Sequence, residues 1–188
     1  MSRPTAKKDP ILRAALELFV ERGIEATTTR EIAVRAQAGE GTMFRHFPSK
    51  EQLAWHLYDW NLRTFLVRLE TASKDQPTTL AKIQAMTREC YALYETDPVL
   101  CTYLLLTEHS VARHMPKDYR TPISLLVETL AHGQKSGEVA SGDPQFLGAL
   151  LFGAILRVPL FKHYGRVNAD LRSIADKTAS QAFRMVKP

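Results

Sequence analysis

The sequence predicts an all-α protein with a small N-terminal head, a connecting helix and a larger helical body. Apolar residues recur at three- and four-residue spacing along most of the chain, no segment keeps the alternation of a strand, and Pro, Gly and Asp-Pro pairs separate the helical stretches. With 188 residues, the chain can form a head joined to a larger core. We divide it into a head, residues 1–50, and a body, residues 51–188, connected by a helix over about residues 50–72.

The head opens with two helices whose ends are marked in the sequence. Asp9 precedes Pro10, and this pair is typical of a helix start. Gly23 ends the first apolar stripe, as glycine does when it takes up the left-handed conformation after a helix. Thr28 with Glu31 three residues later predicts a capping box at the start of the second helix.

A tight turn at Ala38 and Gly39 leads to a third helix over about residues 39–46. Two short helices joined by such a turn are typical of a helix-turn-helix, in which the second helix of the pair enters the major groove of DNA. Ser49 with Gln52 caps the connecting helix that follows. This three-helix head therefore predicts sequence-specific binding to double-stranded DNA.

The body begins after a polar linker at residues 73–79. Its helices are expected over about residues 80–96, 99–112, 116–136, 143–164 and 167–185. Pro159 lies inside the fourth of these patterns, where proline lacks a backbone donor and clashes with the preceding turn. This helix is therefore expected either to kink at Pro159 or to end near Val158.

The composition is ordinary for a globular protein, with 45% apolar and 24% charged residues. The net charge is +5, and the first fifty residues hold nine Lys and Arg against six acids, which agrees with a polyanionic partner without proving one. The basic N-terminus lacks the apolar segment of a secretion signal, and the most apolar run, residues 146–156, is shorter than a membrane span. We expect a cytoplasmic protein with no membrane partner.

The start of the third helix has the chemistry of a DNA reader. Gly41 lets the backbone approach the DNA, Thr42 can bond a phosphate or touch a thymine methyl group, and Glu40 can accept from a cytosine amino group. Arg45 and His46 can reach phosphates or base edges.

Residues outside the third helix add phosphate-binding chemistry. Lys50 is expected to act as a phosphate clamp, and Thr28 and Thr29 stand at a helix N-terminus, where amide groups attract phosphate. Each residue has a structural alternative, since Thr28 can be only a cap and Lys50 only a solvated charge. Their occurrence together within two dozen residues favours the DNA-binding interpretation.

The first sixty residues or so resemble the TetR family of transcriptional regulators, through ILRAALELFVERGIEATTTREIAVRA and GTMFRHFPSKEQL. The resemblance implies a homodimer whose last two helices form a four-helix bundle with their symmetry mates, a palindromic operator, and a small-molecule effector that shifts the connecting helix. The DNA-facing positions that it implies are Thr28, Thr29, Arg30, Glu40, Gly41, Thr42, Phe44, His46 and Lys50. Gln37 is a departure, because the family often has a turn glycine there.

The last two helical patterns supply the residues of the expected dimer interface. The fourth body helix is apolar almost all round, so it is expected to be buried on several sides, and small residues in the last helix allow close packing. The expected interface consists of Phe146, Leu147, Leu150, Leu151, Ala154, Ala175, Ala179, Ala182 and Phe183. Burial of these residues inside a single chain is the alternative.

The effector pocket is expected in the body, where aromatic side chains with a few polar tips have the composition of small-molecule sites. The candidates are Tyr91, Tyr94, Cys101, Tyr103, Leu104, His109, Met115 and Phe161. Aromatic residues at helical spacing also occur in ordinary cores, and that alternative stays open. The composition of the candidates favours an apolar or aromatic ligand.

Catalytic and metal sites are not expected. His109 and His114 are five residues apart, a spacing that does not align two ligands on one helical face, and residues 39–42 lack the lysine of a phosphate-binding loop. We interpret the chain as a DNA-binding transcriptional regulator without cofactor, most simply a repressor released by a small molecule. The alternatives are a DNA-binding protein without ligand control and a helical small-molecule-binding module.

Overall fold

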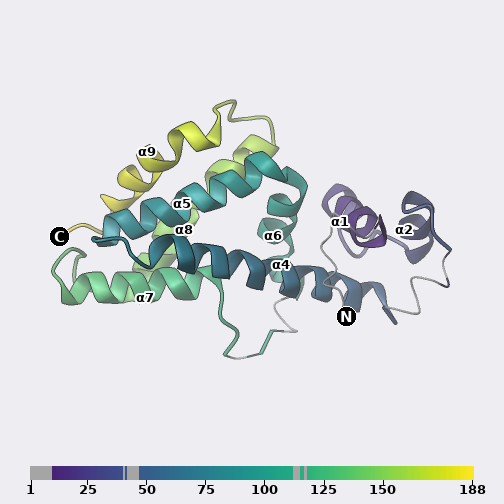
Figure 1. Ribbon diagram of the computed structural model, residues 1–188, viewed down its shortest axis with the longest axis horizontal. Helices are drawn as coiled ribbons and strands as arrows, with labels where there is room; N and C mark the ends of the chain where they lie inside the picture. The colour runs from purple at the N-terminus through teal and green to yellow at the C-terminus, as the bar shows by residue number, and fades with distance from the viewer. Residues whose placement is uncertain (1–9, 40, 42–46, 112–114, 117) are drawn as a thin grey trace. The chain divides into compact units, whose positions relative to one another are not determined.

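The computed structural model describes residues 10–39, 41, 47–111, 115–116 and 118–188, and every regular element in this part of the chain is a helix (Figure 1). The helices are α1 (Pro10–Arg22), α2 (Thr29–Arg35), α4 (Lys50–Ser73), α5 (Thr79–Thr96), α6 (Pro98–Val111), α7 (Pro122–Lys135), α8 (Pro144–His163) and α9 (Leu171–Phe183). The predicted all-α class is confirmed.

The chain forms two compact units. The first comprises Met1–Leu62 and Thr102–Pro116, and the second comprises Arg63–Cys101 and Lys117–Pro188. Helices α4 and α6 contribute residues to both units. The units therefore divide the chain differently from the head and body that we drew at residue 50.

The first unit has an apolar core to which α1, α2, α4 and α6 all contribute. Leu16 of α1 and Ile32 of α2 are fully buried there. Tyr103 of α6 is also fully buried; its ring lies 6.2 Å from that of Phe19, and its hydroxyl donates to the carbonyl of Ala54 on α4 at 2.7 Å. This one side chain connects three helices.

In the second unit, α9 packs along α5 and α8 packs on α7, while α5 also contacts α7 and α8 (Figure 1). Two glycines allow close approach. A Cβ atom at Gly148 would lie 2.7 Å from Cγ2 of Val127 on α7, and one at Gly133 would lie 2.6 Å from side-chain atoms of Thr79 and Val139. Larger residues at these glycines would therefore force the packed elements apart.

Helix α8 continues through Pro159 to His163, so of the two alternatives predicted for Pro159, an end near Val158 is excluded. Proline has no amide hydrogen, so the carbonyl of Ile155, four residues earlier, loses its usual donor. The buried hydroxyl of Tyr91 donates to this carbonyl at 3.0 Å. A side chain from α5 thus replaces the missing backbone bond of α8.

Two predicted helix starts are wrong. Helix α7 begins at Pro122 rather than near residue 116, because Thr121 forms a capping box with Ser124 and Pro122 takes the first helical position, where a proline costs nothing. Helix α9 begins at Leu171 rather than Val167, because Asp170 accepts a hydrogen bond from the amide of the third helical residue.

Among the described helices, α8 is the one that is long and apolar enough to cross a membrane, judged by length and composition alone. From the sequence, its most apolar run, residues 146–156, was predicted to be shorter than a membrane span. Core helices of globular proteins pass the same test, and Leu147, Leu151 and Ile155 are buried in the second unit. Phe146 and Leu150 of the same helix are exposed, so α8 also presents apolar surface outside that core.

Candidate functional site

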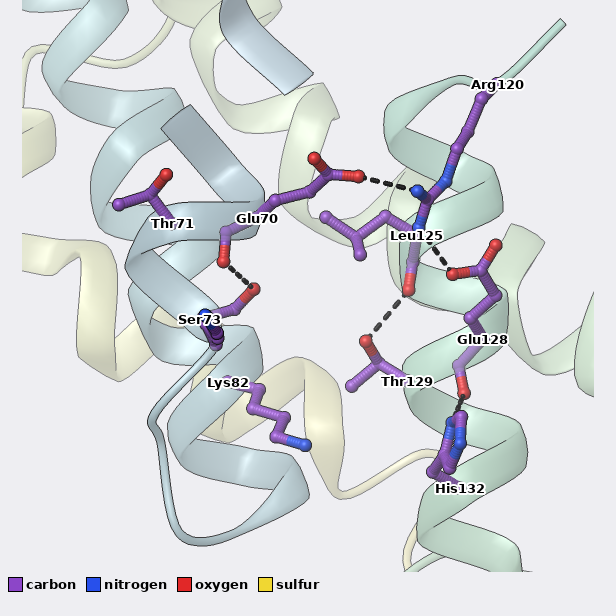
Figure 2. Close-up of a pocket in the computed structure, with 10 residues that line it drawn as sticks. Glu70, Thr71, Ser73, Lys82, Arg120, Leu125, Glu128, Thr129 and His132 are labelled. Carbon is purple, nitrogen blue, oxygen red and sulfur yellow. Dashed lines mark hydrogen bonds and ion pairs between the residues drawn. The ribbon is translucent and has the colours of Figure 1, made fainter. Parts of the chain in front are cut away.

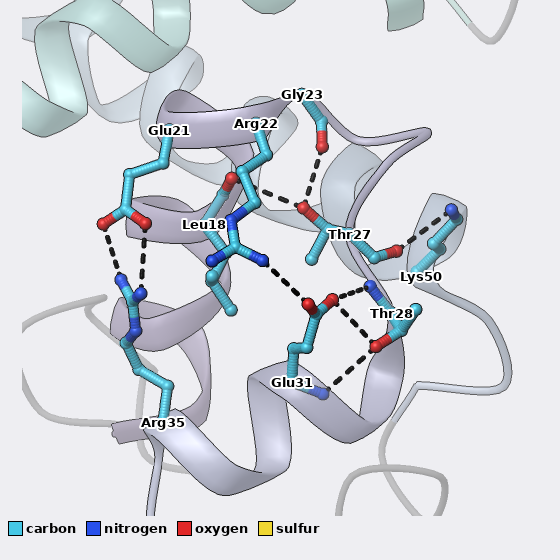
Figure 3. A network of polar contacts seen from close by, with 9 residues as sticks. All are labelled: Leu18, Glu21, Arg22, Gly23, Thr27, Thr28, Glu31, Arg35 and Lys50. Atoms are coloured by element: carbon cyan, nitrogen blue, oxygen red, sulfur yellow. Dashed lines mark hydrogen bonds and ion pairs between the residues drawn. The ribbon is translucent and has the colours of Figure 1, made fainter.

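The N-terminus of α2 carries the predicted capping box, which the structure confirms (Figure 3). The Thr28 hydroxyl accepts from the Glu31 amide at 3.2 Å, and the Glu31 carboxylate accepts from the amide and the hydroxyl of Thr28, both at 2.9 Å. These bonds from Thr28 lower the pKa of the Glu31 carboxyl group. The carboxylate therefore occupies the positive end of α2.

Two ion pairs join α1 to α2. Arg22 donates to Glu31 at 2.8 Å, and Arg35 binds Glu21 through two hydrogen bonds of 2.6 and 3.0 Å (Figure 3). The hydrogen bond from Arg35 is the main reason why the pKa of Glu21 is lowered. The positive charges of Arg22 and Arg35 are thus already paired within the protein.

Lys50 is tied to the segment between α1 and α2. Its ammonium group donates to the carbonyl oxygens of Glu25 at 2.7 Å and Thr27 at 3.1 Å (Figure 3). The Thr27 hydroxyl in turn donates to the carbonyl of Gly23 at 2.8 Å. Since an ammonium group has three donors, one remains for a phosphate oxygen. Lys50 therefore positions the segment before α2, a role that the sequence reading missed.

Arg30 differs from Arg35, the other basic residue of α2. The side chain of Arg30 is exposed, and it has no ion-pair partner in the part of the chain that the structure describes. Thr28 and Gly41 are exposed as well, whereas Thr29 is half-buried. Five of the predicted DNA contacts lie outside the described residues: Glu40, Thr42, Phe44, Arg45 and His46.

The turn after α2 contains a backbone conformation that its sequence does not favour. Gln37 has φ 51°, in the left-handed region, and its amide donates to the carbonyl of Val34 at 3.1 Å. Glutamine stands at the position where the family resemblance led us to expect glycine. The left-handed conformation explains that preference, because only glycine adopts it without steric cost.

Two of the predicted pocket residues use their hydroxyl groups to bind helix carbonyls. Tyr91 donates to Ile155 and Tyr103 donates to Ala54, and burial raises the pKa of both phenols. These bonds supply a backbone partner for each buried hydroxyl. Both residues therefore contribute to the cores of their units, and their place in an effector pocket stays a prediction.

The other candidates for the pocket are distributed over both units. Leu104 and Met115 belong to the first unit, and Tyr94, Cys101 and Phe161 belong to the second. The hydrogen bond with Cys90 and burial raise the pKa of the Cys101 thiol, which disfavours the reactive thiolate. The guanidinium groups of Arg157 and Arg166 lie 5.6 and 5.7 Å from the ring centre of Phe161. The side chain of His109 lies outside the described residues.

The residues predicted for the dimer interface divide into two groups. Six of them are buried within the second unit of a single chain: Leu147, Leu151, Ala175, Ala179, Ala182 and Phe183. These six contribute to the core of that unit, which leaves their part in an interface a prediction. Phe146 and Leu150 are 61% and 41% exposed, and Ala154 is half-buried. Of the residues predicted for the interface, these three leave apolar surface exposed in the single chain.

Comparisons with known proteins agree with this architecture. Residues 11–56 match the family described as bacterial regulatory proteins, tetR family. Over 69 residues, the chain is 45% identical to the HTH-type transcriptional repressor Rv3405c of Mycobacterium tuberculosis, a match that covers 35% of this chain and 36% of the repressor. Over 160 residues, it is 25% identical to the fatty acid metabolism regulator protein of Bacillus subtilis, with 82% of each chain covered.

The fold is shared over the whole chain with the fatty acid degradation regulator FadR from Bacillus halodurans, with a TM-score of 0.81, 18% identity and 97% of both chains covered. The capped α2 and the turn that follows it have the form of the first half of a helix-turn-helix. Residues 11–56 of the chain are therefore similar to the TetR family of bacterial regulatory proteins. The match to Rv3405c spans only about a third of that repressor and about a third of this chain.

Proposed function

We propose that this protein is a transcriptional repressor that binds a palindromic operator as a homodimer and leaves it when a small-molecule effector binds the body. The observation that carries the proposal is α2, which is capped as predicted and lies within the residues 11–56 that match the tetR family; the chain is also 45% identical to a repressor over 69 residues. We assign the protein no enzymatic activity, and we place it in the cytoplasm, where the operator would be.

On the DNA side, Arg30 and Lys50 are proposed to bind phosphates. Arg30 is exposed and unpaired in the described part of the chain, and Lys50 keeps one donor beyond its two carbonyl partners. The proposed base and phosphate contacts also include Thr28, Thr29, Glu40, Gly41, Thr42, Phe44, Arg45 and His46. Because Arg22 and Arg35 are already paired, we leave them out of this set.

The homodimer is proposed to form through the outer face of α8. Phe146, Leu150 and Gly153 are exposed and follow one another at four- and three-residue spacing, so they lie on one side of the helix. A Cβ atom at Gly153 would meet nothing within 4 Å in the single chain, which leaves room for a partner helix. Exposed apolar surfaces of this kind mark interaction sites.

The effector is proposed to be apolar, of the fatty acyl class. The sequence favours an apolar or aromatic ligand, and the 25% identity to a fatty acid metabolism regulator extends over 82% of the chain. Helix α4 contributes residues to both units and provides the covalent route by which a change in the body can reach the head. The alternative is a DNA-binding protein that does not respond to a ligand.

Fluorescence anisotropy tests the proposal, with DNA from around the protein's own gene and random DNA compared across a salt series. We expect the specific site to bind about 10³-fold more tightly or better. Arg30→Ala should weaken binding and lower the salt slope by about one unit for each head that contacts DNA, because one phosphate contact is lost. Lys177→Ala, an exposed lysine of α9, is the matched control and should change neither.

Equal, weak binding to both DNAs, with no specific site in a selection from genomic fragments, would contradict the repressor. Addition of fatty acyl compounds to the specific complex then separates the two remaining functions. Release of the DNA supports ligand control, whereas tight binding that no acyl compound weakens favours the ligand-independent alternative.

A further inference from the structure

A polar pocket of about 410 Å³ lies in the second unit, among the end of α4, the start of α5 and α7 (Figure 2). This volume lies within the range of small-molecule sites. The eight residues that the sequence nominated for the effector pocket do not line it, and Leu125 is its one apolar lining residue. Its chemistry therefore differs from that of a site for an apolar effector.

The two carboxylates of the pocket are both bound by the same guanidinium group. Arg120 contacts Glu70 of α4 at 2.8 Å and Glu128 of α7 at 2.7 Å (Figure 2). The ammonium groups of Lys74 and Lys82 have no hydrogen-bond or ion-pair partner among the described residues. Positive charge in the pocket is thus left without a direct partner.

Lys82 also lies near the carboxylate of Glu138, which does not line the pocket. The pKa of Glu138 is lowered first by the hydrogen bond from the Thr79 amide, and the charge of Lys82 adds to this effect. The Glu138 carboxylate accepts from the Thr79 amide at 2.8 Å and from the Ser136 hydroxyl at 2.9 Å, so other donors occupy it. The lysine side chain from the start of α5 extends into the pocket, on the side of α7 that carries His132 (Figure 2).

The remaining polar groups of the pocket are mostly acceptors. The hydroxyls of Ser73 and Thr129 donate to the carbonyls of Leu69 and Leu125 at 2.7 and 2.8 Å, so their oxygens keep lone pairs for a ligand. Nδ1 of His132 lies 2.7 Å from the carbonyl of Glu128. A carbonyl can only accept, so Nδ1 donates in this contact.

We propose that this pocket binds a small hydroxylated anion, with its phosphate or carboxylate group on Lys74 and Lys82 and its hydroxyl groups donating to the acceptors opposite. The two ammonium groups supply charge-assisted hydrogen bonds, the strongest available here. Such a ligand would connect α4, α5 and α7. The site is separate from DNA binding and from the apolar effector, so it stands or falls independently of the proposed repressor.

Isothermal titration calorimetry of the full chain at constant ionic strength tests this site. The probes are inorganic phosphate, glycerol 3-phosphate and citrate, with glycerol as the neutral control. We expect saturable binding of glycerol 3-phosphate or citrate that is tighter than that of inorganic phosphate, and none of glycerol. The two hydroxylated anions show whether the pocket prefers a phosphate or carboxylates.

The variant Lys82→Ala should weaken binding of the preferred anion at least tenfold, and Lys82→Arg should retain most of it. Lys177→Ala removes the same charge from an exposed position on α9 outside the pocket and should have no effect. The proposal is overturned by any of three results. These are no saturable binding of any anion, unchanged binding by Lys82→Ala, or an equal loss with Lys177→Ala, which would indicate general charge attraction.

Discussion

At the scale of single residues, several side chains satisfy backbone groups that the helices leave without a partner. Tyr91 binds the carbonyl that Pro159 leaves free, and Lys50 binds two carbonyls of the segment before α2. A buried polar group without a partner costs more than a hydrogen bond gains, so the Tyr91 hydroxyl is needed at the buried Ile155 carbonyl. The contacts of Lys50 are exposed or part-buried, so this argument does not extend to them. The roles of both side chains follow from neighbours that are distant in the sequence.

Tyr91→Phe should lower the free energy of unfolding by about 1–3 kcal/mol, because it leaves the carbonyl of Ile155 unpaired in the core. In a Pro159→Ala background, the new amide can donate to that carbonyl, so the same change should cost clearly less. Urea denaturation of the single and double variants measures the difference. Tyr94→Phe, which removes a hydroxyl without a described hydrogen bond, is the control. Equal costs in both backgrounds would show that Tyr91 does not compensate for the proline.

Gln37→Gly should stabilise the protein, because it removes the steric cost of a side chain at φ 51°. The gain should be roughly 0.5–1 kcal/mol, since the greater flexibility of glycine in the unfolded chain offsets part of it. Thermal melting measures the change, and Gln76→Gly, outside the left-handed region, is the matched control and should not stabilise. A lower melting temperature for Gln37→Gly would contradict the steric explanation.

At the scale of elements, helix ends are held by side chains from other helices as well as by their own caps. Glu95 of α5 accepts from Lys162 of α8 at 2.6 Å and from the amide of Leu171, the first residue of α9, at 2.8 Å. One carboxylate therefore connects three helices of the second unit. At Gly148, by contrast, no side chain makes a contact, and this absence allows α7 and α8 to pack closely.

The hydrogen bond from Lys162, followed by that from Leu171, lowers the pKa of Glu95 in the folded protein. A carboxyl group with a lowered folded pKa contributes stability above its unfolded pKa, and this contribution is lost as the pH falls through the folded value. Glu95→Gln should therefore cost about 1.5 kcal/mol at pH 7 and progressively less below pH 4.5. Denaturation at several pH values measures this, with Glu25→Gln, at an exposed glutamate of the first unit, as control. A cost that does not change with pH would contradict the role of the charge.

At the scale of the whole molecule, the proposed activity requires two copies of the chain. The exposed part of α8 offers apolar surface for this, whereas most of the predicted interface is occupied by the core of a single chain. A dimer through α8 would therefore use fewer residues of each chain than the sequence indicated.

Leu150→Asp should convert the dimer to a monomer, because it places a charge in the proposed interface while the exposed site tolerates it in the single chain. Analytical ultracentrifugation measures the mass. Val67→Asp makes the same change at a residue of α4 that is 60% exposed and should leave the mass unchanged. A dimer that persists in Leu150→Asp would exclude this face of α8.

The sequence by itself determined the helical class, the capping box at Thr28, and the resemblance of about the first sixty residues to the TetR family. These depend on hydrophobic periodicity and on contacts between residues three or four apart, which can be read directly from the chain. Only the tertiary structure decided that α8 passes through Pro159, that Lys50 binds the segment before α2, and that Arg120 pairs with Glu70 and Glu128. The reason is that most of these contacts join residues separated by tens of positions, and folding alone brings them together.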